Sequence, residues 1–241
     1  MNTQFLLSEI FSDAWALAKK NIWIIMGFTA IQFLVIFTTF LLTGLGGGAL
    51  IQNVIFGLID AFFTVAIYQV FFKLIDEEGD PEFPDFVPSV IKALNFLAVK
   101  LIMSLLIVLI IASVAAVYFF NMPQIDTTDI MTWKHLPLLL GILIPIVAYV
   151  SVRMCFAVCF IVDQDSGAIE AIRQSWILSK GHFWFLLLLF LVIVGINMLG
   201  AMALFVGLLF TVPLSSLMMI VTYRQMVNSY ADGEEEILLE N

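Results

Sequence analysis

The stretch from residue 181 to residue 223 reads GHFWFLLLLFLVIVGINMLGAMALFVGLLFTVPLSSLMMIVTY and lies between Lys180 and Arg224. It contains no formally charged side chain, and it is about twice as long as the ~20 apolar residues that one helix needs to cross a bilayer. In hydrocarbon, backbone N–H and C=O groups must be bonded within the protein, which favours helices. The stretch therefore predicts a pair of membrane-spanning helices and an all-α, polytopic membrane protein.

The rest of the chain has the same character. Hydrophobic residues make up 62% of the 241 residues and charged residues 12%, whereas soluble domains have about 25% charged residues. We expect one membrane domain over residues 1–241, with little left over for a soluble domain. The predicted membrane-spanning helices are six, at about residues 22–42, 50–72, 97–120, 136–162, 183–200 and 203–223.

The basic residues indicate the orientation of these helices. One side of the predicted topology, or its membrane edge, carries Lys19, Lys20, Lys73, Lys92, Lys100, Arg173, Lys180 and Arg224, and only Lys134 falls in a loop on the other side, at 121–135. Basic residues near span ends are retained in the cytoplasm, so both termini are expected to be cytoplasmic. Their scatter, with a net charge of −9, excludes a nucleic-acid-binding face.

Two stretches of the sequence resemble each other, WALAKKNIW at 15–23 and WILSKGHFW at 176–184. In both, an amphipathic segment leads through a lysine-bearing turn into a span that begins with tryptophan. The expected interfacial anchors are Trp15, Lys19, Trp23, Trp176, Lys180 and Trp184. A weaker version opens at Val87-Pro88-Ser89. The chain is thus predicted to contain three parallel pseudo-repeats, about 1–80, 81–165 and 166–241, each an interfacial amphipathic helix followed by a hairpin.

The C-terminal third has a pattern that resembles a known family. Its elements, in order, are Arg153, Phe160–Asp163, Gly167–Trp176, Ser179–Gly181, Val212–Leu214 and Tyr223–Arg224. They are similar to the bacterial YciC-type integral membrane proteins and to the related membrane domain attached to some glycerophosphodiester phosphodiesterases. The resemblance implies a six-helix protein of the bacterial cytoplasmic (inner) membrane. It implies no hydrolase, because the phosphodiesterase of such relatives is a separate soluble domain that we do not find here.

Four polar residues within the predicted spans are candidate site residues: Asp60, Arg153, Asn197 and Gln69. Ionisable groups inside a bilayer are costly and are therefore functional candidates. Asp60 lies midway along the second span, and Arg153 lies about ten residues inside the fourth, counted from Asp163. They are interpreted either as a polar pathway or as structural groups that fix helix register. Arg153 is expected to bond a carboxylate or exposed backbone carbonyls within the bundle, with Asp60 as the first carboxylate to consider.

The sequence predicts no catalytic, cofactor or metal site. It offers no nucleophile and base in a plausible grouping, and Cys155 and Cys159 have no histidine near them in sequence. We therefore expect a non-catalytic membrane protein that acts in the envelope through lipids, other membrane proteins or a second copy of itself. The alternative is a small transporter or channel component in which Asp60 and Arg153 line a polar path; a continuous polar cavity would favour it.

Overall fold

The computed structural model describes residues 6–44, 49–76, 81–121, 136–203 and 206–239, and these ranges contain helices and no strand. The elements are α1 (Leu7–Lys20), α2 (Ile22–Gly44), α3 (Ala49–Ile75), the 3-10 helix η1 (Phe83–Phe86), α4 (Val90–Asn121), α6 (Leu136–Arg153), α7 (Ala157–Asp163), α8 (Ala168–Leu178), α9 (Phe183–Met202) and α10 (Leu208–Leu239). The predicted all-α fold is confirmed. The predicted loop with Lys134 lies outside the described residues, except for Asn121 at the end of α4.

Five described segments are long and apolar enough to cross a membrane. They are Ile22–Leu41, Asn53–Ile75, Pro84–Val114, Leu140–Asp163 and Phe183–Met202, and they overlap the first five predicted spans. The chain is therefore a multi-pass membrane protein. The sixth predicted span corresponds to the first half of α10, which is not among the five, so the count of six stays a prediction.

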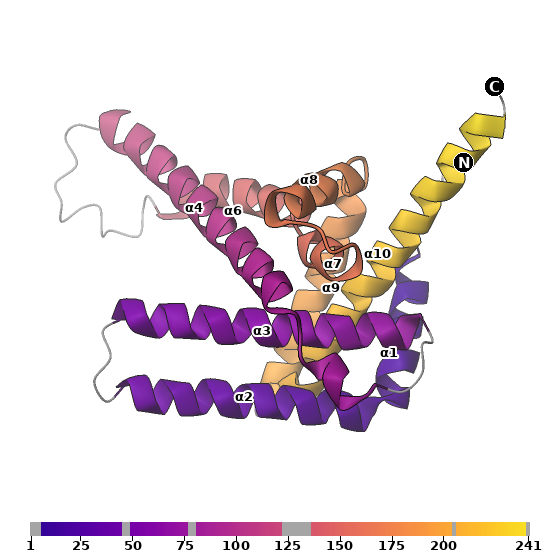
Figure 1. Cartoon of the computed structure of the whole chain (residues 1–241). Coiled ribbons are helices and arrows are strands. Elements are labelled where there is room, and N and C mark those ends of the chain that lie inside the picture. The colour runs from indigo at the N-terminus through magenta and orange to yellow at the C-terminus, as the bar shows by residue number, and fades with distance from the viewer. Residues whose placement is uncertain (1–5, 45–48, 77–80, 122–135, 204–205, 240–241) are drawn as a thin grey trace.

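The long helices form pairs of chain neighbours that contact each other (Figure 1). The pairs are α2 with α3, α4 with α6–α7, and α9 with α10. The core is formed mainly by residues 61–72, 150–162 and 213–226, all on second members, which we call the inner helices. Their partners α2, α4 and α9 expose many large apolar side chains. Because α3 packs against both α7 and α10, it joins the three inner helices.

Three shorter segments pack around these inner helices. Segment α1 lies against α10, η1 lies against α3, and α8 lies against α7. Each segment therefore contacts the inner helix of the preceding pair, and α1 closes the ring by contacting the last pair. The middle segment differs from the prediction. No separate interfacial helix follows Val87-Pro88-Ser89, because residues 90–121 form the single helix α4.

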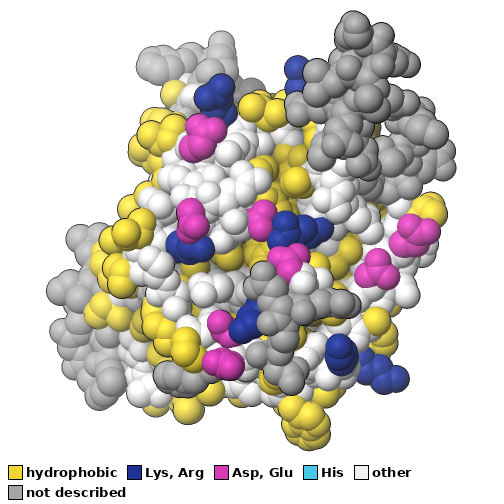
Figure 2. Space-filling model, turned by 45° about the vertical axis from the view of Figure 1, so that its right-hand side comes forward, with side chains coloured by type: hydrophobic (Ala, Val, Ile, Leu, Met, Phe, Trp, Pro, Cys, Tyr) yellow, Lys and Arg dark blue, Asp and Glu magenta, His cyan; other side chains and the backbone are white. Residues whose placement is uncertain are grey.

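Charged side chains gather on one face of the molecule. Figure 2 shows acidic and basic side chains next to each other there, with apolar side chains around them. On this side of the fold α3 ends at Ile75 and α7 ends at Asp163, while α10 continues past Arg224. In the predicted topology this face is cytoplasmic.

Candidate functional site

The fourth predicted span is broken in its second half. Helix α6 ends at Arg153 and α7 begins at Ala157, which leaves backbone groups between them without helical partners. The buried hydroxyl of Ser175 in α8 fills the gap. Its Oγ accepts a hydrogen bond from the Phe156 N–H at 3.1 Å and donates one to the Arg153 carbonyl at 2.9 Å. Discontinuous helices persist in membrane proteins where such groups are satisfied by neighbouring protein.

The side chain of Arg153 lies against two aromatic rings that also contact each other. Its guanidinium carbon is 5.2 Å from the ring centre of Tyr149 and 5.4 Å from that of Trp176. The guanidinium donates through Nε and Nη2 to the Tyr149 hydroxyl at 3.3 and 3.2 Å, and through Nη1 to the Trp176 carbonyl at 3.4 Å. That carbonyl belongs to the last turn of α8, where a cation is favoured by the helix dipole. The expected bond to a backbone carbonyl is therefore observed.

The break also changes where Arg153 lies along its helix. Helix α6 has 18 residues, and at 1.5 Å per residue it is about 27 Å long, close to the ~30 Å of a hydrocarbon core. Arg153 is its last residue, so it lies at the end of a helix of about spanning length, although the apolar segment continues to Asp163. Residues 156–162, the last part of the predicted span, are buried between neighbouring helices of the protein.

Asp60 does not pair with Arg153. Its carboxylate forms an ion pair with Lys100, which joins α3 to α4. Lys100 was expected at the membrane edge, but α4 begins ten residues before it. Asp60 and Lys100 therefore both lie well inside long helices. The two charges proposed to share a path thus have separate partners on different helices.

The amide candidates have local roles. Asn197 in α9 donates through Nδ2 to the Ser215 hydroxyl of α10 at 2.8 Å and to the Ile193 carbonyl at 3.0 Å. It lines a cavity of about 290 Å³ together with Tyr68, Cys155 and Ser215. Gln69 has a buried Oε1 with no hydrogen-bond partner among the described residues. Neither Asp60 nor Arg153 lines this cavity, so the described residues do not show the four candidates around one path.

The expected anchors lie at the ends of α1 and α8 and at the starts of α2 and α9. Trp23 and Trp184 are 86% and 78% exposed, and Lys19 and Lys180 are exposed as well. The other two tryptophans each contact an inner helix. The ring of Trp15 meets that of Phe210 at 5.3 Å, and the ring of Trp176 meets that of Tyr149 at 6.0 Å.

An ion cluster joins the three inner helices and was not anticipated. Arg224 of α10 pairs with Asp163 of α7 at 3.0 Å and with Asp76, the residue after α3. The neighbouring Tyr223 hydroxyl donates to Asp163 at 2.8 Å, and the Arg224 guanidinium lies 4.9 Å from the ring centre of Phe72. The sequence places these charges at span ends, but it does not show which of them meet.

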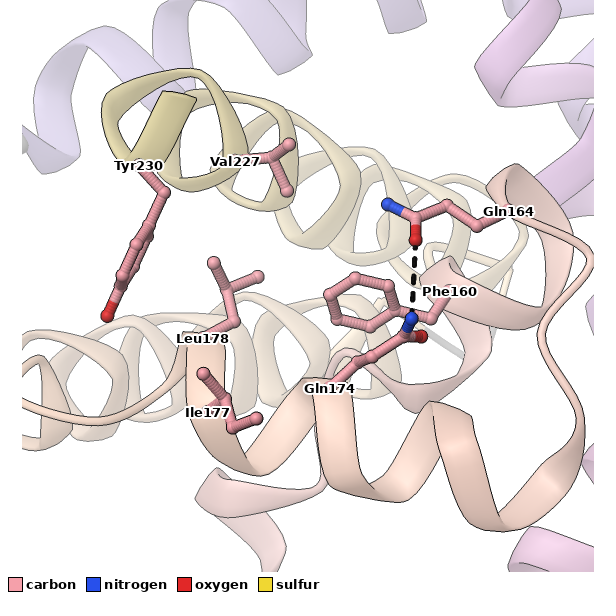
Figure 3. Close-up of a pocket in the computed structure, with 7 residues that line it drawn as sticks. All are labelled: Phe160, Gln164, Gln174, Ile177, Leu178, Val227 and Tyr230. Atoms are coloured by element: carbon pink, nitrogen blue, oxygen red, sulfur yellow. Dashed lines mark hydrogen bonds between the residues drawn. The ribbon is translucent and has the colours of Figure 1, made fainter. Parts of the chain in front are cut away.

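A cavity of about 200 Å³ lies beside this cluster, between α7, α8 and α10 (Figure 3). Its lining is mainly apolar, with a glutamine pair on one side in which Gln174 Nε2 lies 3.5 Å from Gln164 Oε1. The side chains that line it are Phe160, Gln164, Gln174, Ile177, Leu178, Val227 and Tyr230. The described residues contain no group of three or more histidine, cysteine, aspartate or glutamate side chains placed to hold a metal ion.

The break, and Asp163 and Arg224 of the ion cluster, fall in a region with a recognisable family pattern. Residues 119–224 match the family model of the membrane domain of glycerophosphoryl diester phosphodiesterase. The predicted relation to that membrane domain is confirmed, while the resemblance to YciC-type proteins stays a prediction. No curated protein and no solved structure shows significant similarity to the chain. The matched region includes Arg153, Ser175 and Arg224, but not α1, α2 or α3.

Proposed function

We propose that the chain is a non-catalytic protein of the bacterial cytoplasmic membrane that acts through contacts with lipids or membrane proteins. Both termini are cytoplasmic in this proposal, because the basic residues cluster on that side. The description of the matched family concerns the membrane part of an enzyme. It supports the membrane role and gives no reason to assign a hydrolytic step to these helices.

The observation that carries the proposal is the exposed apolar surface of α1 and α8. Each helix uses small side chains in its contact with an inner helix, Ala14 and Ala18 in α1, and Ala171 and Ser175 in α8. Ile10 and Leu178 are buried with them, but several large apolar side chains remain outside, with Trp15 45% and Ile169 78% exposed. Helices with such faces lie in the headgroup layer, where the apolar side meets lipid or a partner.

The ring of contacts supports three pseudo-repeats with the boundaries predicted from the sequence. Each short segment packs on the inner helix of the preceding pair, as repeats related by an axis along the membrane normal would do. In such an arrangement the segments form a collar at one membrane surface. The collar is then the part of the protein that is presented to lipids and partners.

The transport alternative required Asp60 and Arg153 to line one path. Asp60 is paired with Lys100, and Arg153 is bonded to Tyr149 and Trp176, so the two groups are used separately. The geometry therefore favours the contact role over the path.

Ion and proton flux through the full chain in vesicles of phosphatidylethanolamine and phosphatidylglycerol tests the choice. We expect no flux above that of empty vesicles. A flux that Asp60→Asn abolishes would overturn the proposal. In the same vesicles, a photoreactive residue at Ile169 is expected to form adducts with lipid, and one at Glu170, a polar neighbour on the same helix, to form fewer.

A further inference from the structure

Arg153 differs in what it binds from four other cations on the described helices. Lys73 pairs with Asp85, Lys92 with Asp165, Lys100 with Asp60, and Arg224 with both Asp76 and Asp163. Arg153 has no carboxylate partner among the described residues. Its partners are a tyrosine hydroxyl and a backbone carbonyl, all at 3.2 Å or more, and two ring faces.

A second uncompensated cation follows α8 in the chain. The hydroxyl of Ser179 lies 3.4 Å from the Arg153 carbonyl, and Lys180 is the next residue. Lys180 is exposed and forms no ion pair within the described part of the chain. Helix α9 begins three residues later, at Phe183, whose ring contacts Tyr149 at 5.4 Å. The end of α6 and the start of α9 therefore lie together, with a cation at each.

The depth of Arg153 and Lys180 in the membrane decides which kind of anion they can bind. A spanning helix ends at Arg153 and another begins just after Lys180, so both cations lie where hydrocarbon gives way to headgroups. Trp184 and Ile177 nearby are exposed apolar side chains. Three of the five guanidinium N–H groups are used by Tyr149 and Trp176, which leaves two for a phosphate.

We propose that Arg153, assisted by Lys180, binds the phosphate of an anionic phospholipid of the cytoplasmic leaflet. The aromatic rings of Tyr149 and Trp176 hold the guanidinium in place, and Ser175 and Ser179 fix the backbone that carries it. The proposal rests on the proposed lipid-contact function and names the lipid class and the residues. A net negative headgroup is preferred over a zwitterionic one because two cations face it and no carboxylate of the described residues neutralises either.

The test is lipid retention by the full chain, purified in mild detergent and exposed to equal amounts of phosphatidylglycerol and phosphatidylcholine. Native mass spectrometry then counts the lipids that stay bound. We expect the wild type to retain phosphatidylglycerol in excess, and Arg153→Gln to weaken that binding about ten-fold, the loss of one charge-assisted contact. Arg173→Gln is the matched control, because it removes the same charge from α8 at a side chain that is 72% exposed and faces Glu170 at 3.8 Å.

Further variants settle the result if Arg153→Gln does not fold. Arg153→Lys keeps the charge without the planar fork, and Lys180→Gln removes an exposed side chain that has no described partner. A reduced preference for phosphatidylglycerol in either one supports the site, and an unchanged preference in both overturns it. Excess inorganic phosphate is expected not to displace the lipid; displacement would show a site for the free anion and contradict the proposal. Equal retention of both lipids by the wild type would refute this site. It would not refute the proposed function, which is tested separately by the flux measurement in vesicles.

Discussion

Helices α1 and α8 occupy equivalent places on two inner helices, and they differ where those inner helices differ. At the offset that aligns Trp15 with Trp176, Ala14 corresponds to Ser175 and Ala18 to Ser179. All four small side chains are buried. Helix α10, under α1, is continuous from Leu208 to Leu239, whereas α6 and α7, next to α8, are broken.

The difference shows what the serines do. An intact helix satisfies its own backbone, so alanine is enough for close packing against α10. The break after Arg153 leaves backbone groups open, and the hydroxyls of α8 bond them. The aromatic partners differ in the same sense, because Trp15 contacts the apolar ring of Phe210 and Trp176 contacts Tyr149, whose hydroxyl bonds Arg153. Among the described residues, the tryptophan of α8 also contacts an arginine of its inner helix, Arg153, and Trp15 has no such contact.

The largest effect is expected at Arg224 of α10, which joins the inner helix under α1 to α7, the inner helix under α8. Arg224→Met leaves the carboxylates of Asp76 and Asp163 without their cation. We expect a loss of about 2–3 kcal/mol of stability, below the 3–5 that follows removal of one partner from a fully buried pair, because the Arg224 side chain is 27% exposed. Thermal unfolding in detergent can be followed by the reaction of buried Cys159 with a thiol-reactive dye. A loss no greater than that of the surface variant Arg173→Met would contradict the role of the cluster.

A reciprocal pair of substitutions tests the comparison itself. Ser175→Ala removes the bonds to Phe156 N–H and Arg153 C=O, and an unsatisfied buried group costs about 1–3 kcal/mol. Ala14→Ser puts a hydroxyl against an intact helix, where it can bond a carbonyl of its own helix, so the expected loss is below about 1 kcal/mol. The same dye assay measures both. Equal losses would mean that the serine is a packing residue and that the break is satisfied in another way.

A smaller effect is expected at Asp60 of α3, a helix that is not part of the comparison between α1 and α8. Substitutions Asp60→Asn and Lys100→Met should be coupled by about 1 kcal/mol in a double-mutant cycle, because the two side chains form an ion pair. Asp60→Asn and Arg153→Met should be additive, since each of these residues has its own partner. If instead Asp60 and Arg153 are coupled and Asp60 and Lys100 are additive, the transport alternative, with Asp60 and Arg153 on one polar path, would be favoured again.

The features that were predicted from the sequence are those that depend on local composition. Apolar runs of spanning length with at most one charged residue identify the spanning helices, and the repeated tryptophan and lysine positions identify α1 and α8. The break at residues 154–156 has no such signal, because the surrounding residues YVSVRMCFAVCF contain neither glycine nor proline. It depends on Ser175, which is contributed by another helix.

The wrong expectations have equally local causes. Residues 90–121 contain no glycine or proline, so the predicted interfacial segment continues into the span as α4. The pairing of Asp60 with Lys100 depends on which faces of α3 and α4 meet, and hydropathy does not report helix rotation. The fourth predicted span is counted as one continuous helix, whereas the structure breaks it after Arg153.

The central claim is that α1 and α8 lie at one membrane surface and place Arg153 at its headgroup level. Spin labels at residues 19 and 180, introduced one at a time as Lys19→Cys and Lys180→Cys with Cys155 and Cys159 replaced by alanine, test it in lipid vesicles. Collision rates with oxygen and with a nickel chelate report the depth of each label. We expect both labels at headgroup level in the leaflet that faces the C-terminus. A label in the centre of the hydrocarbon, or two labels in opposite leaflets, would contradict the account.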